Sequence, residues 1–310
     1  MSFLLLVWGV LFLYAGGEAL VRGAATIGRH FGISSIVIGL TVVSIGTSSP
    51  ELAATLAGVF QDAPAVSFGN VVGSNIANLG LVLGLTALIW PLDIAARFIR
   101  REVPFMLLVS AATFVLVIDG SIGRVEGAAL LVALALYLHS LLRSKEEPEV
   151  EAEFDREYGE ERHSILWSVV AVALGIALLV VGAQVLIRGA IGLARAMGVT
   201  ERVIGLTMVA FGTSLPELAS CVVAAMRREG DLVLGNLIGS NIFNILFILG
   251  TTSVILPISV ETAAVWPDLI VMMAISVLTW LLLRSGRRLA RKEGLLLMAT
   301  YFAYLFYLFV

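Results

Sequence analysis

Two glutamates, Glu51 and Glu217, lie well inside apolar stretches that are otherwise uncharged. Each directly follows a proline, Pro50 or Pro216, within the sequences TSSPE and TSLPE. Proline cannot donate to the carbonyl four residues earlier, so a helix opens there and exposes backbone oxygens beside the carboxylate. The preceding Ser and Thr add hydroxyl oxygens, and we expect them to cap the helix that restarts. Such oxygens are ligands for hard cations such as Na⁺ or Ca²⁺.

A second polar motif follows each glutamate, GNVVGSNIAN over residues 69–78 and GNLIGSNIFN over residues 235–244. In both copies an Asn, a Ser and a second Asn are spaced four residues apart and share one helix face. These are Asn70, Ser74 and Asn78, and Asn236, Ser240 and Asn244. Ca²⁺ takes about six to eight oxygen ligands, which two carboxylates and these polar groups can supply. Mg²⁺ fits less well because it gives up its waters reluctantly.

The two motif pairs belong to an internal repeat. A shift of 166 residues aligns residues 22–84 with 188–250 without a gap, and 27 of the 63 pairs are identical. The repeat predicts a first unit over residues 1–142 and a second over 164–310, with the repeated motifs at 39–84 and 205–250. Residues 143–163 form an acidic linker between them.

The elements that carry the repeat are membrane helices. Hydrophobic residues make up 59% of the 310 positions, more than one soluble core can hide. A spanning helix needs about 20 apolar residues, and ten such stretches are present. They lie near residues 2–27, 33–59, 65–90, 103–119, 124–142, 164–194, 200–226, 232–257, 264–283 and 293–310. The predicted fold is an all-α membrane protein of ten transmembrane helices.

Five helices in each half is an odd number, so the second half enters the membrane from the opposite side. Inverted repeats with broken, polar segments in matching positions are typical of secondary transporters with a site near the membrane midplane. Sixteen of the 20 Lys and Arg residues fall on the loops opposite the termini. The positive-inside rule then predicts a plasma-membrane protein with extracellular termini and a cytoplasmic linker.

The duplicated pattern GxTxxxxGTSxPEL followed by GNxxGSNIxN resembles the α-repeats of the cation/Ca²⁺ exchanger superfamily, specifically its sodium/calcium exchanger branch. The resemblance implies that both TSxPE glutamates bind Ca²⁺ with the adjoining Thr and Ser oxygens. It also implies that the Ser and second Asn of GSNIxN contribute to Na⁺ sites. The metal ligands implied here are Glu51, Thr47, Ser48, Ser74 and Asn78, with Glu217, Thr213, Ser214, Ser240 and Asn244.

The resemblance further implies exchange of three Na⁺ for one Ca²⁺, which would make transport electrogenic. One position departs from the pattern of several prokaryotic relatives, which have Asp where this chain has Asn244. The centre therefore holds two carboxylates. We expect Ca²⁺ and Na⁺ as transported ions, no organic cofactor, a lipid bilayer as the surroundings and no nucleic-acid partner, with a site that one chain can complete.

Other functions use similar residues. A cation/proton exchanger could carry protons on Glu51 and Glu217, although the GN pairs lack the GNxxE acid of the proton-driven branch. A cation channel usually gathers its filter from several subunits, whereas this duplication builds one site within one chain. An intramembrane hydrolase would need a His or Lys beside Ser48 or Ser214, and the sequence has neither in mid-span. We therefore expect a transporter and not an enzyme.

Overall fold

The computed structural model describes residues 2–31, 33, 35–61, 63–143, 164–197, 212–286 and 288–309, almost all of them helical. The first half contains α1 (Ser2–Phe31), α2 (Ser35–Ile38), η1 (Gly39–Val43), α3 (Ser44–Thr47), α4 (Ser49–Phe60), α5 (Pro64–Ala77), η2 (Asn78–Leu83), α6 (Gly84–Ile89), β1 (Leu92–Asp93), η3 (Phe98–Glu102), α7 (Val103–Leu116), β2 (Ser121–Ile122) and α8 (Arg124–Arg143). The second contains α10 (Ile165–Ala196), α12 (Leu215–Met226), α13 (Gly230–Phe243), η4 (Asn244–Leu249), α14 (Gly250–Ile255), β3 (Ile258–Ser259), α15 (Thr262–Gly286), β4 (Arg288–Leu289) and α16 (Arg291–Phe309). Elements marked η are π-helical turns.

The sequence repeat reappears in the bounds of the helices. The series α5, η2 and α6 recurs as α13, η4 and α14 at the same offset of 166 residues, and α4 recurs as α12. Counterparts of α2, η1 and α3 would fall mainly within residues 198–211, and most of the acidic linker within residues 144–163. Both segments lie outside the described residues.

Length and composition identify six helices of the described part that can cross a membrane. A seventh span is counted if the pair Ile36–Thr47 and Ser49–Phe60, bent by 43°, is one broken span. The remaining expected spans correspond to α7, α12 and α16, and α7 and α12 are only 14 and 12 residues long. These helices agree with a multi-pass helical membrane protein. The number of ten transmembrane helices stays a prediction.

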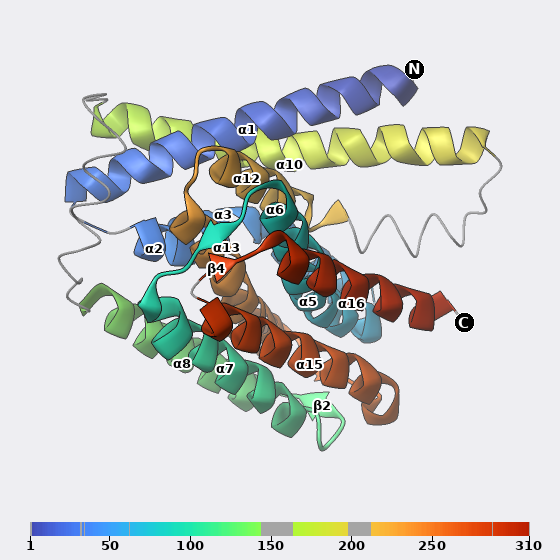
Figure 1. Ribbon diagram of the computed structural model, residues 1–310. Coiled ribbons are helices and arrows are strands. Elements are labelled where there is room, and N and C mark those ends of the chain that lie inside the picture. The colour runs from blue at the N-terminus through green and yellow to red at the C-terminus, as the bar shows by residue number, and fades with distance from the viewer. Residues whose placement is uncertain are drawn as a thin grey trace.

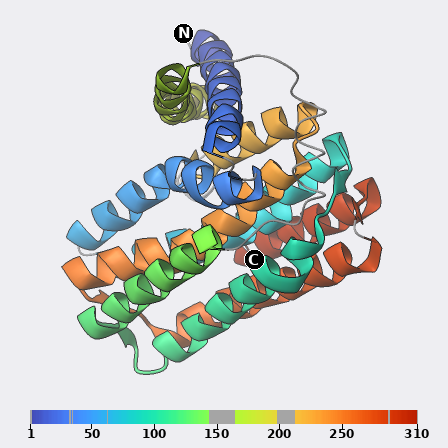
Figure 2. The ribbon, with the colours of Figure 1, turned by 90° about the vertical axis from the view of Figure 1, so that its left-hand side faces the viewer.

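Helices α1 and α10 lie side by side along one edge of the bundle in both views (Figures 1 and 2). They meet along what we call the glycine seam, formed by Gly9, Gly16 and Gly23 of α1 and Gly175, Gly182 and Gly189 of α10. A Cβ atom built on any of these six would lie within 3.0 Å of the facing helix. Small residues at seven-residue spacing thus let the two backbones approach closely, as is common between membrane helices.

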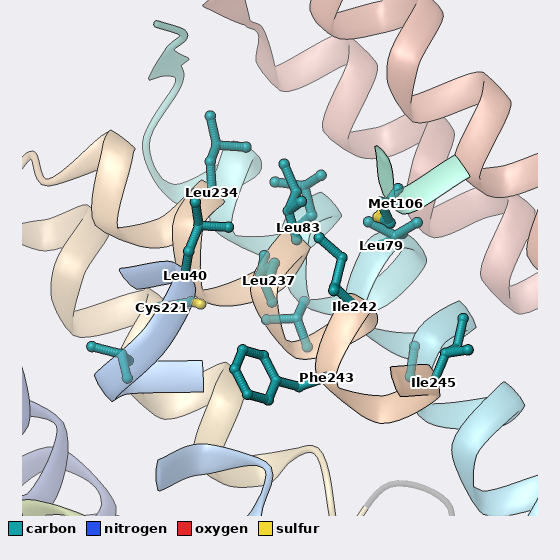
Figure 3. Close-up of a cluster of buried hydrophobic side chains, with 14 of the residues drawn as sticks. Leu40, Leu79, Leu83, Met106, Cys221, Leu234, Leu237, Ile242, Phe243 and Ile245 are labelled. Atoms are coloured by element: carbon teal, nitrogen blue, oxygen red, sulfur yellow. The ribbon is translucent and has the colours of Figure 1, made fainter. Parts of the chain in front are cut away.

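The centre of the molecule is formed by the two repeated polar helices. Almost every residue of α13 is buried, and α13 packs against η1, α2 and α3 of the other half. Figure 3 shows the apolar side chains around it, including Leu40 of η1, Leu79 and Leu83 of η2, and Leu237 and Phe243 of α13. The polar motifs are therefore surrounded by a continuous apolar shell that both halves build.

Two short antiparallel strand pairs join the halves. Strand β1 pairs with β4, with Leu92 opposite Leu289, and β2 pairs with β3, with Ile122 opposite Ile258. Each pair contains one strand from either half. These two strand pairs connect the halves at the ends of their helices.

Candidate cation site

The two predicted glutamates occupy matching places at helix breaks. Helix α3 ends at Thr47, Ser48 leaves the helical conformation (φ −81°, ψ 5°), and α4 restarts with Pro50 in its first turn and Glu51 directly after it. Ser214 has nearly the same backbone angles (φ −86°, ψ 4°) before α12, which carries Pro216 and Glu217. Both glutamate side chains are fully buried. The predicted helix break is therefore present beside each carboxylate in the structure.

Most of the carboxylate oxygens have no hydrogen-bond partner among the described residues. Within that part of the chain, both oxygens of Glu51 and the Oε2 atom of Glu217 are buried without one, and so are the Oδ1 atoms of Asn78 and Asn244. Buried polar atoms normally find partners, because leaving one unpaired costs about 1–3 kcal/mol, more for charged groups. Unpaired buried acceptor oxygens of this kind are groups that a bound cation would satisfy.

The break in the first half reaches across to the second half. The Ser48 hydroxyl donates to Oε1 of Glu217 at 3.2 Å, and the Thr47 hydroxyl donates to Oδ1 of Asn236 at 3.1 Å. These bonds bring Thr47 and Ser48 beside the second carboxylate. Since Ser48 lies only three residues before Glu51, these bonds bring the two helix breaks close together.

The expected capping role of these hydroxyls is wrong. Ser48 and Ser214 are the N-cap residues of α4 and α12, yet neither side chain bonds to the helix that it precedes. The Ser48 hydroxyl is instead drawn to the Glu217 carboxylate, a charged acceptor that forms a stronger bond than a backbone partner does. The hydroxyls of Thr213 and Ser214 have no hydrogen-bond partner in the described part of the chain.

The motif of Asn, Ser and Asn at four-residue spacing also lies at the centre. Its three residues do not all have the same role, although the spacing predicted one shared helix face. Asn70 donates to the backbone carbonyl of Glu51 at 3.2 Å and to the Thr55 hydroxyl at 3.0 Å, so it supports the helix break. Asn78 and Asn244 open the π-helical turns η2 and η4. Ser74 and Ser240 are buried one turn before them.

Comparison with known proteins decides the family. The sodium/calcium exchanger protein family matches residues 1–142 and 167–310 of the chain. The chain belongs to this family. Family membership and the apolar helices together identify a multi-pass membrane transporter.

Two relatives of this exchanger match almost the whole chain. CaxA of Alkalimonas amylolytica is 38% identical over 97% of this chain and 96% of its own length. The sodium/calcium exchanger MaX1 of Methanosarcina acetivorans is 34% identical over 99% of this chain and 98% of its own. A solved structure of the sodium-calcium exchanger NCX_Mj, 34% identical, superposes with a TM-score of 0.83 over 97% of this chain and 96% of that one.

Two residues of the centre were missed by the sequence interpretation. Asn75 and Asn241, each directly after the motif serine, are buried and bonded to the opposite half of the exchanger. They lie off the helix face that the four-residue spacing selects, so periodicity did not point to them. The available signal was that both copies carry the same asparagine at this position.

Proposed function

We propose that the protein exchanges Na⁺ for Ca²⁺ across the plasma membrane, with both ions competing for the site that contains Glu51 and Glu217. The observation that carries the proposal is the pair of fully buried glutamates. Three of their four carboxylate oxygens have no hydrogen-bond donor among the residues that the structure describes. An ionised side chain inside a membrane costs several kcal/mol unless it is compensated. A transported cation supplies that compensation.

The charge of the site explains the coupling. Two ionised glutamates carry two negative charges, which one Ca²⁺ or two Na⁺ neutralise, and a third Na⁺ adds one net charge. An empty, charged site is too costly to move past the hydrophobic barrier, so the protein changes its facing only when it is loaded. Exchange of three Na⁺ for one Ca²⁺ moves one net charge per cycle and responds to membrane voltage.

The liganding set that we propose contains the two glutamates with the hydroxyls of Thr47, Ser48, Thr213, Ser214, Ser74 and Ser240 and the amide oxygens of Asn78 and Asn244. All of these residues except the half-buried Thr213 are buried around the two helix breaks, which supports this assignment. All of them come from one chain, so a monomer suffices for transport.

The architecture that we propose is ten transmembrane helices in two inverted five-helix units, residues 1–142 and 164–310. Matching element bounds at the repeat offset support it. The excess of Lys and Arg on the loops opposite the termini supports extracellular termini and a cytoplasmic acidic linker over residues 143–163. Helices α1 and α10, joined by the glycine seam, are the body that moves against the rest during alternating access.

The deciding experiment is ⁴⁵Ca²⁺ uptake into proteoliposomes that contain the purified protein. An outward Na⁺ gradient is compared with a matched K⁺ gradient and with a pH gradient, for the wild type, Glu51→Gln and Glu217→Gln. We expect uptake that requires internal Na⁺ and is absent from both variants. Because three Na⁺ leaving for one Ca²⁺ entering carries one positive charge out of the lumen, uptake should increase when a K⁺ diffusion potential makes the lumen more positive.

Asp268→Asn is the matched control. Asp268 is a half-buried carboxylate of α15 that accepts a hydrogen bond from the Tyr304 hydroxyl at 2.9 Å, and an asparagine oxygen can accept the same bond. This variant should retain uptake. Uptake that follows the pH gradient and ignores Na⁺ would make the protein a cation/proton exchanger, and uptake that survives both glutamine substitutions would refute the site.

A further inference from the structure

Four asparagines at the centre form a closed set of hydrogen bonds across the two halves. Asn75 donates to the backbone carbonyl of Asn241 at 3.3 Å, and Asn241 donates to the backbone carbonyl of Asn75 at 3.2 Å. Asn75 and Asn241 are equivalent positions of the repeat. Each therefore uses its NH₂ group to hold the backbone of its counterpart.

The side-chain oxygens of the same two residues hold the second asparagine of the opposite motif. Asn244 donates to Oδ1 of Asn75 at 2.9 Å, and Asn78 donates to Oδ1 of Asn241 at 3.1 Å. All four side chains are almost completely buried. We call this set the asparagine clamp.

The clamp fixes which way the amides of Asn78 and Asn244 point. A carboxamide carries donors on nitrogen and acceptors on oxygen, so turning either amide over would place its oxygen against the oxygen of Asn241 or Asn75. With nitrogen held toward the clamp, the Oδ1 atoms of Asn78 and Asn244 face away from it, and both are buried without a hydrogen-bond partner in the described chain. An acceptor kept unpaired in this way is available to a cation.

We propose that Asn75 and Asn241 are positioning residues that aim the amide oxygens of Asn78 and Asn244 at the transported cation. Each acts across the interface between the halves: Asn75 on Asn244, and Asn241 on Asn78. The inference rests on the proposed function, because it assigns a role to residues behind the ligands of that site. Groups that orient metal ligands typically account for about 10- to 100-fold in metal affinity.

Each positioning residue acts on a ligand of the opposite half, so the proposal predicts which double variants are non-additive. General damage to the protein would not produce that pattern. The measurement is the Ca²⁺ concentration for half-maximal Na⁺-dependent uptake in proteoliposomes, with maximal rate recorded separately. Asn75→Ala should raise this concentration about 10- to 100-fold. The double variant Asn75→Ala/Asn244→Ala should raise it no further than Asn244→Ala alone, because the oriented oxygen is already absent.

The control pair joins residues of one half. In Asn75→Ala/Asn78→Ala the first change disorients Asn244 and the second removes a separate ligand, so the two fold-changes should multiply. The mirror pair Asn241→Ala/Asn78→Ala should repeat the non-additive result. Asn75→Leu, which keeps the number and branching of the side-chain heavy atoms and lacks the amide, replaces Asn75→Ala should that variant fail to fold.

Fold-changes that multiply in the crossed pairs, or an unchanged half-maximal concentration in Asn75→Ala and Asn75→Leu, would overturn the clamp. The proposed function fails in a different way, through the absence of Na⁺-dependent uptake in the wild-type protein. Retained uptake with additive crossed pairs therefore rejects the positioning role alone.

Discussion

The glycine seam between α1 and α10 leaves no room for a methyl group, and Gly16→Ala tests this. The new Cβ would lie 2.8 Å from the backbone nitrogen of Leu179 and 2.9 Å from the carbonyl oxygen of Gly175, where ordinary contact begins at 3.4 Å. Both neighbours are backbone atoms, which cannot turn aside as a side chain does. The helices must therefore separate by several tenths of an ångström.

Overpacking of this kind typically costs about 1–3 kcal/mol. With about 2–4 °C per kcal/mol for a large domain, the midpoint of thermal unfolding in detergent should fall by about 2–12 °C. Gly175→Ala meets the same contact from the other side, because its Cβ would lie 2.8 Å from the carbonyl oxygen of Gly16. The double variant should thus lose less than the two single losses combined, since one separation accommodates both methyl groups.

Ala15→Val is the control for the seam. Ala15 is an exposed neighbour of Gly16 on the same helix, and its substitution adds two methyl groups on the outer face. Its unfolding midpoint should stay close to that of the wild type. An unchanged midpoint in Gly16→Ala, or equal losses in Gly16→Ala and Ala15→Val, would refute the close approach of the two helices.

Two further predictions concern charged groups outside the site. Glu18 of α1 accepts from Arg227 Nε at 2.9 Å, whereas the equivalent positions of the repeat are the exposed Gln184 and Gln61. A partly exposed ion pair contributes about 0.2–1 kcal/mol. Removing it by Glu18→Gln should therefore shift the equilibrium between the two conformations of the transporter, one open to each side of the membrane, by up to about fivefold. The labelling of cysteines placed near Arg227 should change accordingly. Tyr137 donates to the fully buried Glu102 at 2.7 Å, and Tyr304 donates to the half-buried Asp268. Tyr137→Phe should therefore cost about 1.5–3 kcal/mol of stability and Tyr304→Phe less, and equal losses in thermal unfolding would contradict this reasoning.

The sequence was sufficient to find the two carboxylates because a buried charge in a membrane span has few purely structural explanations. Glu51 and Glu217 also occur in matching copies, which separated them from Glu18, whose counterpart in the repeat is Gln184. The break before each glutamate followed from the covalent structure of proline. These local properties do not depend on how the halves pack, and the structure has both breaks where they were predicted.

Contacts across the two halves could not be predicted in this way. The four-residue spacing of Asn70, Ser74 and Asn78 assumes a regular α-helix, but a π-helical turn begins at Asn78 and changes which side chains face the partner helix. The partner of Asn78 is Asn241, 163 positions further along the chain. A helix-face argument within one segment contains no information about such a distant residue.

A repeat with the same motif residues in both copies also conceals the structural difference between those copies. In this conformation Thr47 and Ser48 of the first half bond to Asn236 and Glu217 of the second. The equivalent hydroxyls of Thr213 and Ser214 have no partner within the described residues, and neither has the Glu51 carboxylate. The sequence carries the same groups in both copies, so the asymmetry belongs to the conformation.

Alternating access between inverted repeats gives that asymmetry a meaning. In the alternating-access mechanism proposed above, each half would adopt, in the opposite facing, the conformation that the other half has here. Ser214 should then bond to Glu51 and Thr213 to Asn70, while Ser48 and Thr47 become free. The two facings would present the cation with equivalent oxygens drawn from opposite halves, which explains why a transporter that binds the same ions from both sides keeps two nearly identical copies of its motif.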